Sequence, residues 1–207
     1  TSLAIAASMA GGMRLNFGTD VKPLHVGLAA ANAIKSADWA TAGLSASRAD
    51  LFAPQGILAT LSGRGSWGWP DGLTLGQPFA IVQPGFERKR FPGCYMLHKI
   101  MALGIEIARE QISLAQIERI DVIMPRGGTR PLIHPAPITG KEALFSIPYA
   151  VLAAIGDGDV SFTTFTDEAV GRTALRERFR DIFVTEAGEE LATSEALGAA
   201  PVRIVLR

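Results

Sequence analysis

A segment dense in glycine, proline and tryptophan divides this 207-residue chain into two parts with different hydrophobic patterns. It lies between Leu61 and Pro92 and includes the run SGRGSWGWPDGLTLGQPFAIVQPG. Glycine and proline favour turns and loops, so we interpret the segment as a connection with one short extended piece. The sequence therefore predicts a domain boundary near Gly85, with residues 1–84 and 85–207 as two domains.

The first part has helical spacing throughout. The chain opens on the alanine-rich pattern TSLAIAASMAGGM, which has little polar face, and such a helix is typical of the interior of a larger assembly. Residues 24–39 carry apolar side chains at a second helical spacing that ends at Gly43, and residues 45–52 suggest a short helix capped by Ser47. We therefore expect an all-helical first domain and a chain that is a fragment of a longer one.

The second part alternates helical and strand patterns. Residues 94–110 and 144–158 predict helices, the latter containing Pro148 and ended by Gly156 and Gly158, and residues 173–183 predict a charged amphipathic helix. Residues 117–125 and 200–207 alternate as strands do. Helices interspersed with strands indicate an α+β domain.

The overall charge excludes some partners. Lys plus Arg and Asp plus Glu each number 20, so no electrostatic surplus favours nucleic acid or an anionic membrane. The single cysteine cannot form an internal disulfide, which favours a cytoplasmic location. No apolar run reaches the roughly 18 residues of a membrane span, so no transmembrane helix is expected.

A basic turn is the first candidate site. In ERKRFPGCYMLH, residues 87–98, Pro92 and Gly93 predict a tight entry into a helix, which puts Cys94 in its first turn. Lys89 and Arg90 come just before that helix N-terminus, whose free N–H groups favour anions. The pattern suits a carboxylate or phosphate receptor. A solvated basic loop ahead of a core helix is the alternative.

Cys94 and His98 stand four residues apart, a helical spacing that could serve a metal or a thiolate–imidazole pair. With one cysteine and three histidines, at positions 25, 98 and 134, a closed zinc site lacks ligands. We therefore predict no metal, and a small packed thiol is favoured over a nucleophile for Cys94.

Two further stretches have open interpretations. In FGTDVKPLHVG, Lys22 and His25 lie within one turn of a helix start, which suits negative charge. Helix capping with a surface lysine is the alternative, and it is preferred if nothing else supports a site. In FSIPYAV, Ser146 lies near a helix start, and Tyr149 follows among apolar neighbours. A buried tyrosine needs a hydrogen-bond partner, so Tyr149 either supports the fold or donates to a substrate.

In this order, GTDVKPLHVGLAA, KRFPGCYMLH and EALFSIPYAVLAAIGDG resemble the MmgE/PrpD family, which includes 2-methylcitrate dehydratases, cis-aconitate decarboxylases and iminodisuccinate epimerases. The resemblance implies a helical bundle domain, to which residues 1–84 would contribute, followed by an α+β lid of antiparallel strands with helices. It also implies an active site in the cleft between the domains, no cofactor, and a homodimer. Family members are longer than this chain and carry further active-site residues in an N-terminal helical portion.

The same resemblance implies roles for individual residues. Lys22 matches the lysine that the family places at its substrate cleft, and Lys89 matches the basic residue before its aromatic-Pro turn. His25 lies beside Lys22, and Tyr149 matches the tyrosine of the family's FSIPY stretch. These four form the expected catalytic set. The expected substrate-binding set is Arg90, Cys94, His98 and Ser146. Cis-aconitate decarboxylases have histidine at the position of Cys94, which disfavours decarboxylation.

The function that the resemblance implies is a dehydratase-like lyase acting on a small di- or tricarboxylate. The lysines and Arg90 would stabilise negative charge next to a carboxylate, and His25, His98, Tyr149 or a group outside this chain would move a proton. Three alternatives stay open: an isomerase or epimerase of the same family, a non-catalytic remnant that binds a carboxylate or a partner subunit, and a thiol enzyme that uses Cys94.

Overall fold

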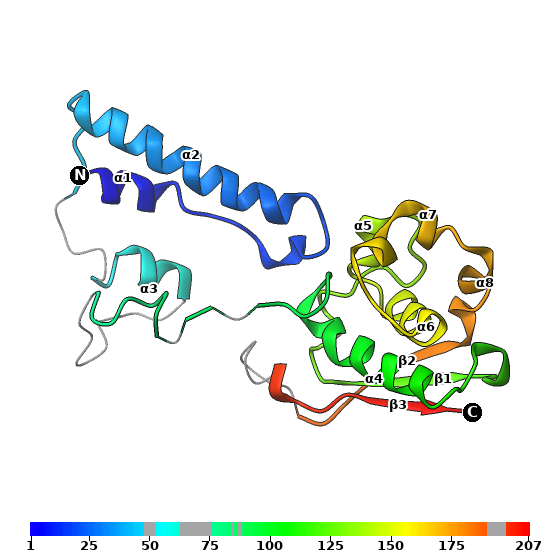
Figure 1. The fold of residues 1–207 in the computed structure, drawn as a ribbon. Helices are drawn as coiled ribbons and strands as arrows, with labels where there is room; N and C mark the ends of the chain where they lie inside the picture. Colours follow the sequence, from blue (N-terminus) through cyan, green and yellow to red (C-terminus); the bar gives the residue numbers. More distant parts are fainter. Residues whose placement is uncertain (48–52, 63–75, 84, 87, 190–197) are drawn as a thin grey trace. The chain divides into compact units, whose positions relative to one another are not determined.

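The structure is a computed structural model that describes residues 1–47, 53–62, 76–83, 85–86, 88–189 and 198–207 (Figure 1). It divides into two compact units, Thr1–Glu87 and Arg88–Arg207. The first is helical wherever it has regular structure, and the second combines helices with a small sheet, so the chain has the α+β fold expected from its patterns. None of the described helices has the length and apolar run needed to cross a bilayer.

The first unit is built around one long helix. The structure has α1 at Ser2–Ser8, a 3-10 turn at Arg14–Asn16, α2 at Val21–Thr41 and α3 at Ile57–Ser62. Helix α1 lies alongside α2, where the side chain of Asn32 donates to the carbonyl of Met9 at 3.2 Å (Figure 1). The predicted helices at the start of the chain and over residues 24–39 are confirmed. Most of the short helix predicted over residues 45–52 lies outside the described residues, and α3 was not predicted.

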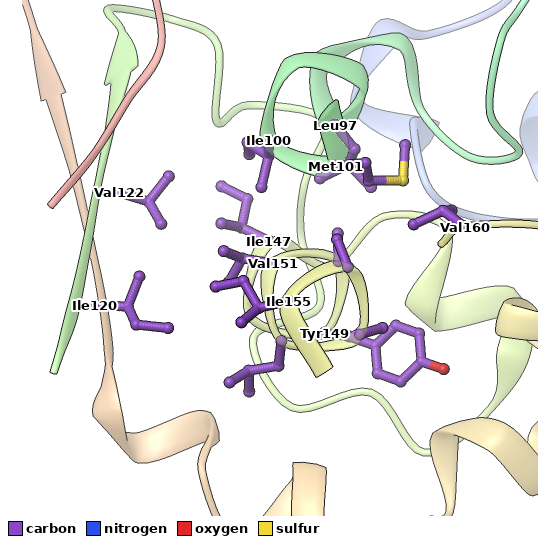
Figure 2. Close-up of a cluster of buried hydrophobic side chains, with 14 of the residues drawn as sticks. Leu97, Ile100, Met101, Ile120, Val122, Ile147, Tyr149, Val151, Ile155 and Val160 are labelled. Atoms are coloured by element: carbon purple, nitrogen blue, oxygen red, sulfur yellow. The ribbon is translucent and has the colours of Figure 1, made fainter. Parts of the chain in front are cut away.

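The second unit packs its helices on one face of the sheet. Helix α4 is His98–Arg109, α6 is Ile147–Asp157, and strand β1 is Ile120–Pro125. Figure 2 shows Ile147, Val151 and Ile155 of α6 facing Ile120 and Val122 of β1. Every residue of α6 from Ile147 to Ile155 is buried, because the sheet, α4 and the segment after α6 surround it. The predicted helix over residues 144–158 is confirmed, and Gly158 ends it in the left-handed conformation.

The sheet has the order β2-β1-β3, with β2 at Ile182–Ala187 and β3 at Arg203–Leu206. Strand β1 runs parallel to β2 and antiparallel to β3, so the prediction of an antiparallel sheet is wrong: the sheet is mixed. The chain between β1 and β2 contains α6, and it is this helical crossover that allows the parallel pair.

Two element predictions in the second unit are also wrong. Residues 173–183 form the short helix α8, Thr173–Arg176, then a 3-10 turn at Phe179–Asp181 and the start of β2, in place of one amphipathic helix. The helix predicted to start at Cys94 begins as a separate 3-10 turn, Tyr95–Leu97, and α4 proper starts at His98.

The remaining short elements follow α4 and flank α6. They are 3-10 turns at Leu114–Gln116 and Phe162–Phe165, helix α5 at Gly140–Ala143 and helix α7 at Asp167–Val170. Helix α5 contacts both α7 and the 3-10 turn Phe162–Phe165, which precedes α7. The N–H of Gly140 donates to the Asp167 carboxylate at 2.7 Å, which ties the two helix starts together.

Candidate functional site

The basic turn, residues Arg88–Cys94, is anchored to the core of the second unit by a buried side chain and a backbone hydrogen bond. The side chain of Phe91 is 5% exposed and belongs to the hydrophobic core. The N–H of Cys94 donates to the carbonyl of Leu144, just after α5, at 2.9 Å. Gly93 has φ +100°, and a Cβ there would lie 3.3 Å from the same carbonyl, so glycine suits both the conformation and the close approach.

The cations of the basic turn stay at the surface while Phe91 is buried. Arg88, Lys89 and Arg90 are all exposed. The Lys89 ammonium donates to the carbonyl of Gly93 at 2.8 Å, and the Arg90 guanidinium carbon lies 5.0 Å from the centroid of the Phe91 ring. An ammonium has three donors, so Lys89 keeps donor capacity for a ligand beyond this bond. The turn thus holds consecutive positive charges on a rigid base.

The geometry around Cys94 differs from the prediction. Cys94 has extended backbone angles, φ −64° and ψ 139°, and precedes the 3-10 turn, so it is not in the first turn of a helix. The predicted helical i, i+4 relation between Cys94 and His98 is therefore wrong. Cys94 is half-buried and packs against the core cluster, as expected of a small packed thiol.

His98 lies behind the basic turn. Its ring centroid is 5.7 Å from that of Phe91 and 5.3 Å from that of Tyr95. Burial, and then the positive charge of Lys89, lower the pKa of His98, while a hydrogen bond to the backbone of Phe91 opposes this shift. Nε2 is buried and has no hydrogen-bond partner among the described residues. The structure therefore does not present this nitrogen to solvent or to a ligand.

Lys22 and His25 lie near the start of α2 in the first unit. The Lys22 ammonium lies 4.0 Å from the centroid of the Phe17 ring, a cation–π contact, and the lysine is exposed. His25 is half-buried beside Gly12, where a Cβ would come within 3.1 Å of the imidazole Nδ1. Asp20 precedes the helix without capping it through its side chain. Lys22 is thus exposed, and among the described residues its ammonium contacts the Phe17 ring.

Ser146 and Tyr149 serve the fold within this unit. Ser146 is fully buried and caps α6, accepting the N–H of Tyr149 at 3.3 Å. Tyr149 is also fully buried and points away from the sheet (Figure 2), and its hydroxyl donates to the carbonyl of Thr164. Burial raises the pKa of Tyr149, and the nearby Arg172 guanidinium offsets part of that shift. Tyr149 therefore fits a role in supporting the fold better than the catalytic role expected of it. Ser146 fits a role as helix cap better than the expected role in substrate binding.

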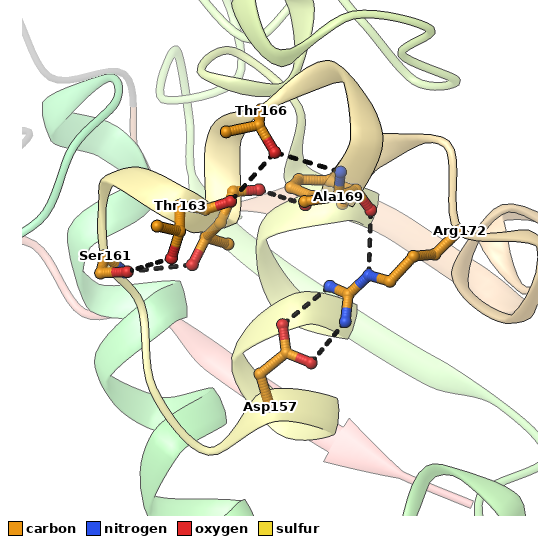
Figure 3. A network of polar contacts seen from close by, with 8 residues as sticks. Asp157, Ser161, Thr163, Thr166, Ala169 and Arg172 are labelled. Carbon is orange, nitrogen blue, oxygen red and sulfur yellow. Dashed lines mark hydrogen bonds and ion pairs between the residues drawn. The ribbon is translucent and has the colours of Figure 1, made fainter.

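A polar network closes the end of α6 beside this tyrosine (Figure 3). Arg172 makes two hydrogen bonds to the Asp157 carboxylate, each 2.7 Å, and a third to the carbonyl of Ala169 at 2.9 Å. The hydrogen bond with Asp157 raises the pKa of Arg172. A bidentate pair of this kind fixes direction as well as distance, so it positions the loop between α6 and α8.

The RGGTR loop, residues 126–130, binds a carboxylate of the chain itself. Glu186 on β2 accepts the N–H groups of Gly127 and Thr129, each at 3.0 Å, and the hydroxyl of Thr129. Burial alone would raise the pKa of Glu186, but these hydrogen bonds outweigh it and hold the pKa below its ordinary value. The carboxylate thus links β2 to the loop after β1.

We expect Glu186→Gln to lower the free energy of unfolding by about 1 kcal/mol at neutral pH, a modest value because Glu186 is exposed. In the parent chain the folded carboxyl has the lower pKa. The unfolded state therefore binds more protons as the pH falls below about 4.5, and stability falls with it. Urea unfolding at a series of pH values would measure both effects, with the exposed Glu177→Gln as control. If the free energy of unfolding of Glu186→Gln fell with decreasing pH as steeply as that of the parent chain, the lowered pKa could not be assigned to Glu186.

No group of three or more His, Cys, Asp or Glu side chains that could hold a metal ion occurs among the residues with described positions. A hollow of about 750 Å³ lies in the first unit, between α1 and the segment that includes α3. Its described lining is uncharged, with Ser8, Ser47, Gln55 and Thr60 as polar members, and contains no predicted site residue. The chemistry-bearing candidates are therefore the basic turn and the start of α2.

The sequence of this chain is similar to those of known proteins. The sequence model of the MmgE/PrpD C-terminal domain matches residues 91–206, more than half of the chain. Human cis-aconitate decarboxylase is 26% identical over 182 residues, covering 85% of this chain, and the mouse protein of the same name is 25% identical over 190 residues, covering 87%. The chain spans 37–38% of the length of these two relatives.

Proposed function

The chain belongs to the MmgE/PrpD family, and on that premise we propose that it forms part of a lyase that acts on a small di- or tricarboxylate. The observation that carries the proposal is the basic turn, whose exposed cations stand on a buried phenylalanine. Such an arrangement suits a carboxylate ligand, and the two relatives are named cis-aconitate decarboxylase. The homodimer and the cytoplasmic location stay predictions.

Lys22 and Lys89 are the proposed substrate cations, with Arg90 as a further donor. Removing a proton from a carbon next to a carboxylate leaves negative charge that a positioned ammonium stabilises. In a dehydration, the electron pair of the broken C–H bond forms a carbon–carbon double bond, and the hydroxyl group on the next carbon leaves as water. The convergence of the two lysines on one substrate is a prediction of this proposal.

The proton must be moved by another group. Tyr149 suits this poorly, since its hydroxyl is buried and donates to Thr164, and the buried Nε2 of His98 suits it little better. His25, half-buried near Lys22 on α2, is the proposed proton-transfer residue of this chain. Further acidic or histidine groups would come from the remainder of the longer family members.

Dehydration is proposed ahead of decarboxylation because Cys94 replaces the histidine that cis-aconitate decarboxylases have at the matching position. A thiol carries no positive charge in either protonation state, so this half-buried cysteine cannot replace an imidazolium. Proton-transfer isomerisation or epimerisation is the second candidate function, since it begins with the same proton abstraction next to a carboxylate.

The proposal is tested with the full-length protein that contains this sequence, incubated with 2-methylcitrate, citrate, cis-aconitate and iminodisuccinate. We expect turnover of at least one, with kcat/KM reduced about tenfold to a hundredfold in Lys22→Ala and in Lys89→Ala. The effect should stay below that of a fully buried donor, because both lysines are exposed. Unimpaired turnover in both variants would defeat the assignment of these lysines.

Matched controls come from exposed cations on the same units. Lys35→Ala, on α2, and Arg180→Ala, whose side chain is 85% exposed, should leave turnover within about twofold, because neither lies at a candidate site. The non-catalytic alternative is tested separately by calorimetry of citrate on the 207-residue chain. Binding without any turnover by the full-length protein would favour a remnant, and a fully active Cys94→Ser variant would exclude a thiol enzyme.

A further inference from the structure

The loop after β1, residues 126–130, directs three hydrogen-bond donors at one carboxylate. The N–H of Gly127 donates to one oxygen of Glu186 and the N–H of Thr129 donates to the other, each at 3.0 Å. The Thr129 hydroxyl donates to the second oxygen as well. Backbone N–H groups in a turn form concave receptors of this kind for anions. The Glu186 side chain therefore shows which ligand the loop accepts: an oxyanion with two acceptor oxygens side by side.

The loop holds its shape through its own backbone. The N–H of Gly128 donates to the carbonyl of Pro125 at 2.8 Å, and the N–H of Arg126 donates to the carbonyl of the last residue of β2 at 3.2 Å. Gly127 has φ +86°, and a Cβ at Gly128 would lie 2.9 Å from the Pro125 carbonyl oxygen, so both positions suit glycine. None of these contacts uses the Glu186 side chain. The donors of the loop therefore stay in place when that side chain turns away.

The loop is open to solvent and flanked by positive charge. Glu186, Arg126 and Arg130 are all exposed, and the guanidinium carbon of Arg130 would lie 3.7 Å from a Cβ at Gly127. Two cations thus stand beside one carboxylate, so the loop keeps a positive surplus with Glu186 in place. Strands β1 and β2 run parallel and end at the same edge of the sheet. Outside the carboxyl ends of parallel strands is where ligands commonly bind.

We propose that residues 126–130 form a second oxyanion site, separate from the basic turn, in which Glu186 is a resident competitor that a free carboxylate or phosphate displaces. Displacement needs only rotation of the exposed Glu186 side chain, since β2 pairs with β1 through its backbone. Ligand binding therefore releases the end of β2 from the loop. The inference does not depend on the proposed function, because the basic turn supplies none of the groups that form this site.

Removal of the competitor should strengthen binding. Inorganic phosphate and succinate would each be titrated into the ¹⁵N-labelled 207-residue chain at neutral pH and constant ionic strength, and the amide signals of Gly127 and Thr129 would be followed. We expect weak, saturable binding to the parent chain and an affinity about tenfold higher or more in Glu186→Ala, because an intramolecular carboxylate no longer competes for the donors. Tighter binding of phosphate than of succinate would identify a phosphate ligand, and the reverse order would identify a carboxylate.

Further variants separate the site from a general effect of charge. Glu177→Ala removes another exposed carboxylate and should leave the affinity within about twofold of the parent value, whereas Glu186→Gln keeps an acceptor without the charge and should give an intermediate affinity. In the Glu186→Ala background, Thr129→Val and Arg130→Ala should each weaken binding severalfold. Equal affinities of Glu186→Ala and the parent chain would overturn the proposal. So would the absence of saturable shifts at Gly127 and Thr129 in the parent chain, because the link between Glu186 and the loop would then be permanent.

Discussion

Replacement of Gly140 by alanine is expected to lower the free energy of unfolding of the second unit by about 4 kcal/mol or more. A Cβ at this position would lie 2.0 Å from the carbonyl oxygen and 2.7 Å from the carbonyl carbon of Phe165. Both atoms belong to the backbone, so no change of rotamer relieves the overlap. Helix α5 would have to move away from the 3-10 turn Phe162–Phe165 and from α7 directly after it, which breaks the 2.7 Å hydrogen bond from Gly140 to Asp167.

Urea unfolding measures this loss, and the aromatic residues make the measurement specific. All three tryptophans, at 39, 67 and 69, lie in the first unit, and both tyrosines, Tyr95 and Tyr149, lie in the second. Tyrosine ring signals in NMR therefore report the second unit alone. Gly156→Ala is the control, because the added Cβ comes closest to the flexible end of the Leu114 side chain, at 3.0 Å, and meets Leu175 only at 3.7 Å, an ordinary contact distance. Equal stability of the two variants would contradict the close approach at Gly140.

The Gly140→Ala substitution should also loosen the basic turn. The carbonyl of Leu144, directly after α5, accepts the N–H of Cys94 and lies against Gly93. Displacement of α5 would move that acceptor and loosen the turn that carries Lys89. A partly folded Gly140→Ala variant is therefore expected to show faster amide exchange at Cys94.

The sequence predicted best where local pattern and packing agree. Helix α6 was predicted because its apolar run has a capping serine at one end and a left-handed glycine at the other, and both signals are local. Strand β2 was missed because it is an edge strand and mostly exposed, so it lacks a clear buried-and-exposed alternation. It is a strand because its backbone pairs with β1, more than 50 residues earlier, and short-range spacing does not encode that pairing.

The candidate site shows the same limit at the level of single residues. Proline and glycine predicted a tight turn before α4, and one is present. The extended backbone of Cys94 was not predictable, because its N–H bonds to Leu144, 50 residues later. The apolar surroundings of Tyr149 indicated that its hydroxyl needs a partner, but that partner is a carbonyl in the 3-10 turn Phe162–Phe165, 15 residues away. Glu186 was missed altogether, since the loop that it binds and the strand that bears it are 57 to 59 residues apart.

The close contact between α4 and α6 depends on one glycine, so its replacement is also expected to lower the free energy of unfolding by a large amount. Gly104 is buried in α4, and a Cβ added there would lie 2.6 Å from the Cβ of Ala154 and 3.4 Å from the carbonyl of Val151. We expect Gly104→Ala to lower the free energy of unfolding by about 3 kcal/mol, the upper range for overpacking a close-packed core. Thermal or urea unfolding of the second unit would measure the loss.

Exchanging the two residues tests the cause. In the double variant Gly104→Ala with Ala154→Gly, one methyl group again lies between the helices, so the overlap is removed. Glycine within α6 costs about 1 kcal/mol, and alanine within α4 returns a similar amount, so helix propensity nearly cancels. The double variant should therefore recover about 2 kcal/mol of the loss, as an interaction energy between neighbouring sites. If the loss of stability in the double variant equalled the sum of the losses in the two single variants, the helices would not meet at this pair. The packing of α4 on α6 would then need another origin.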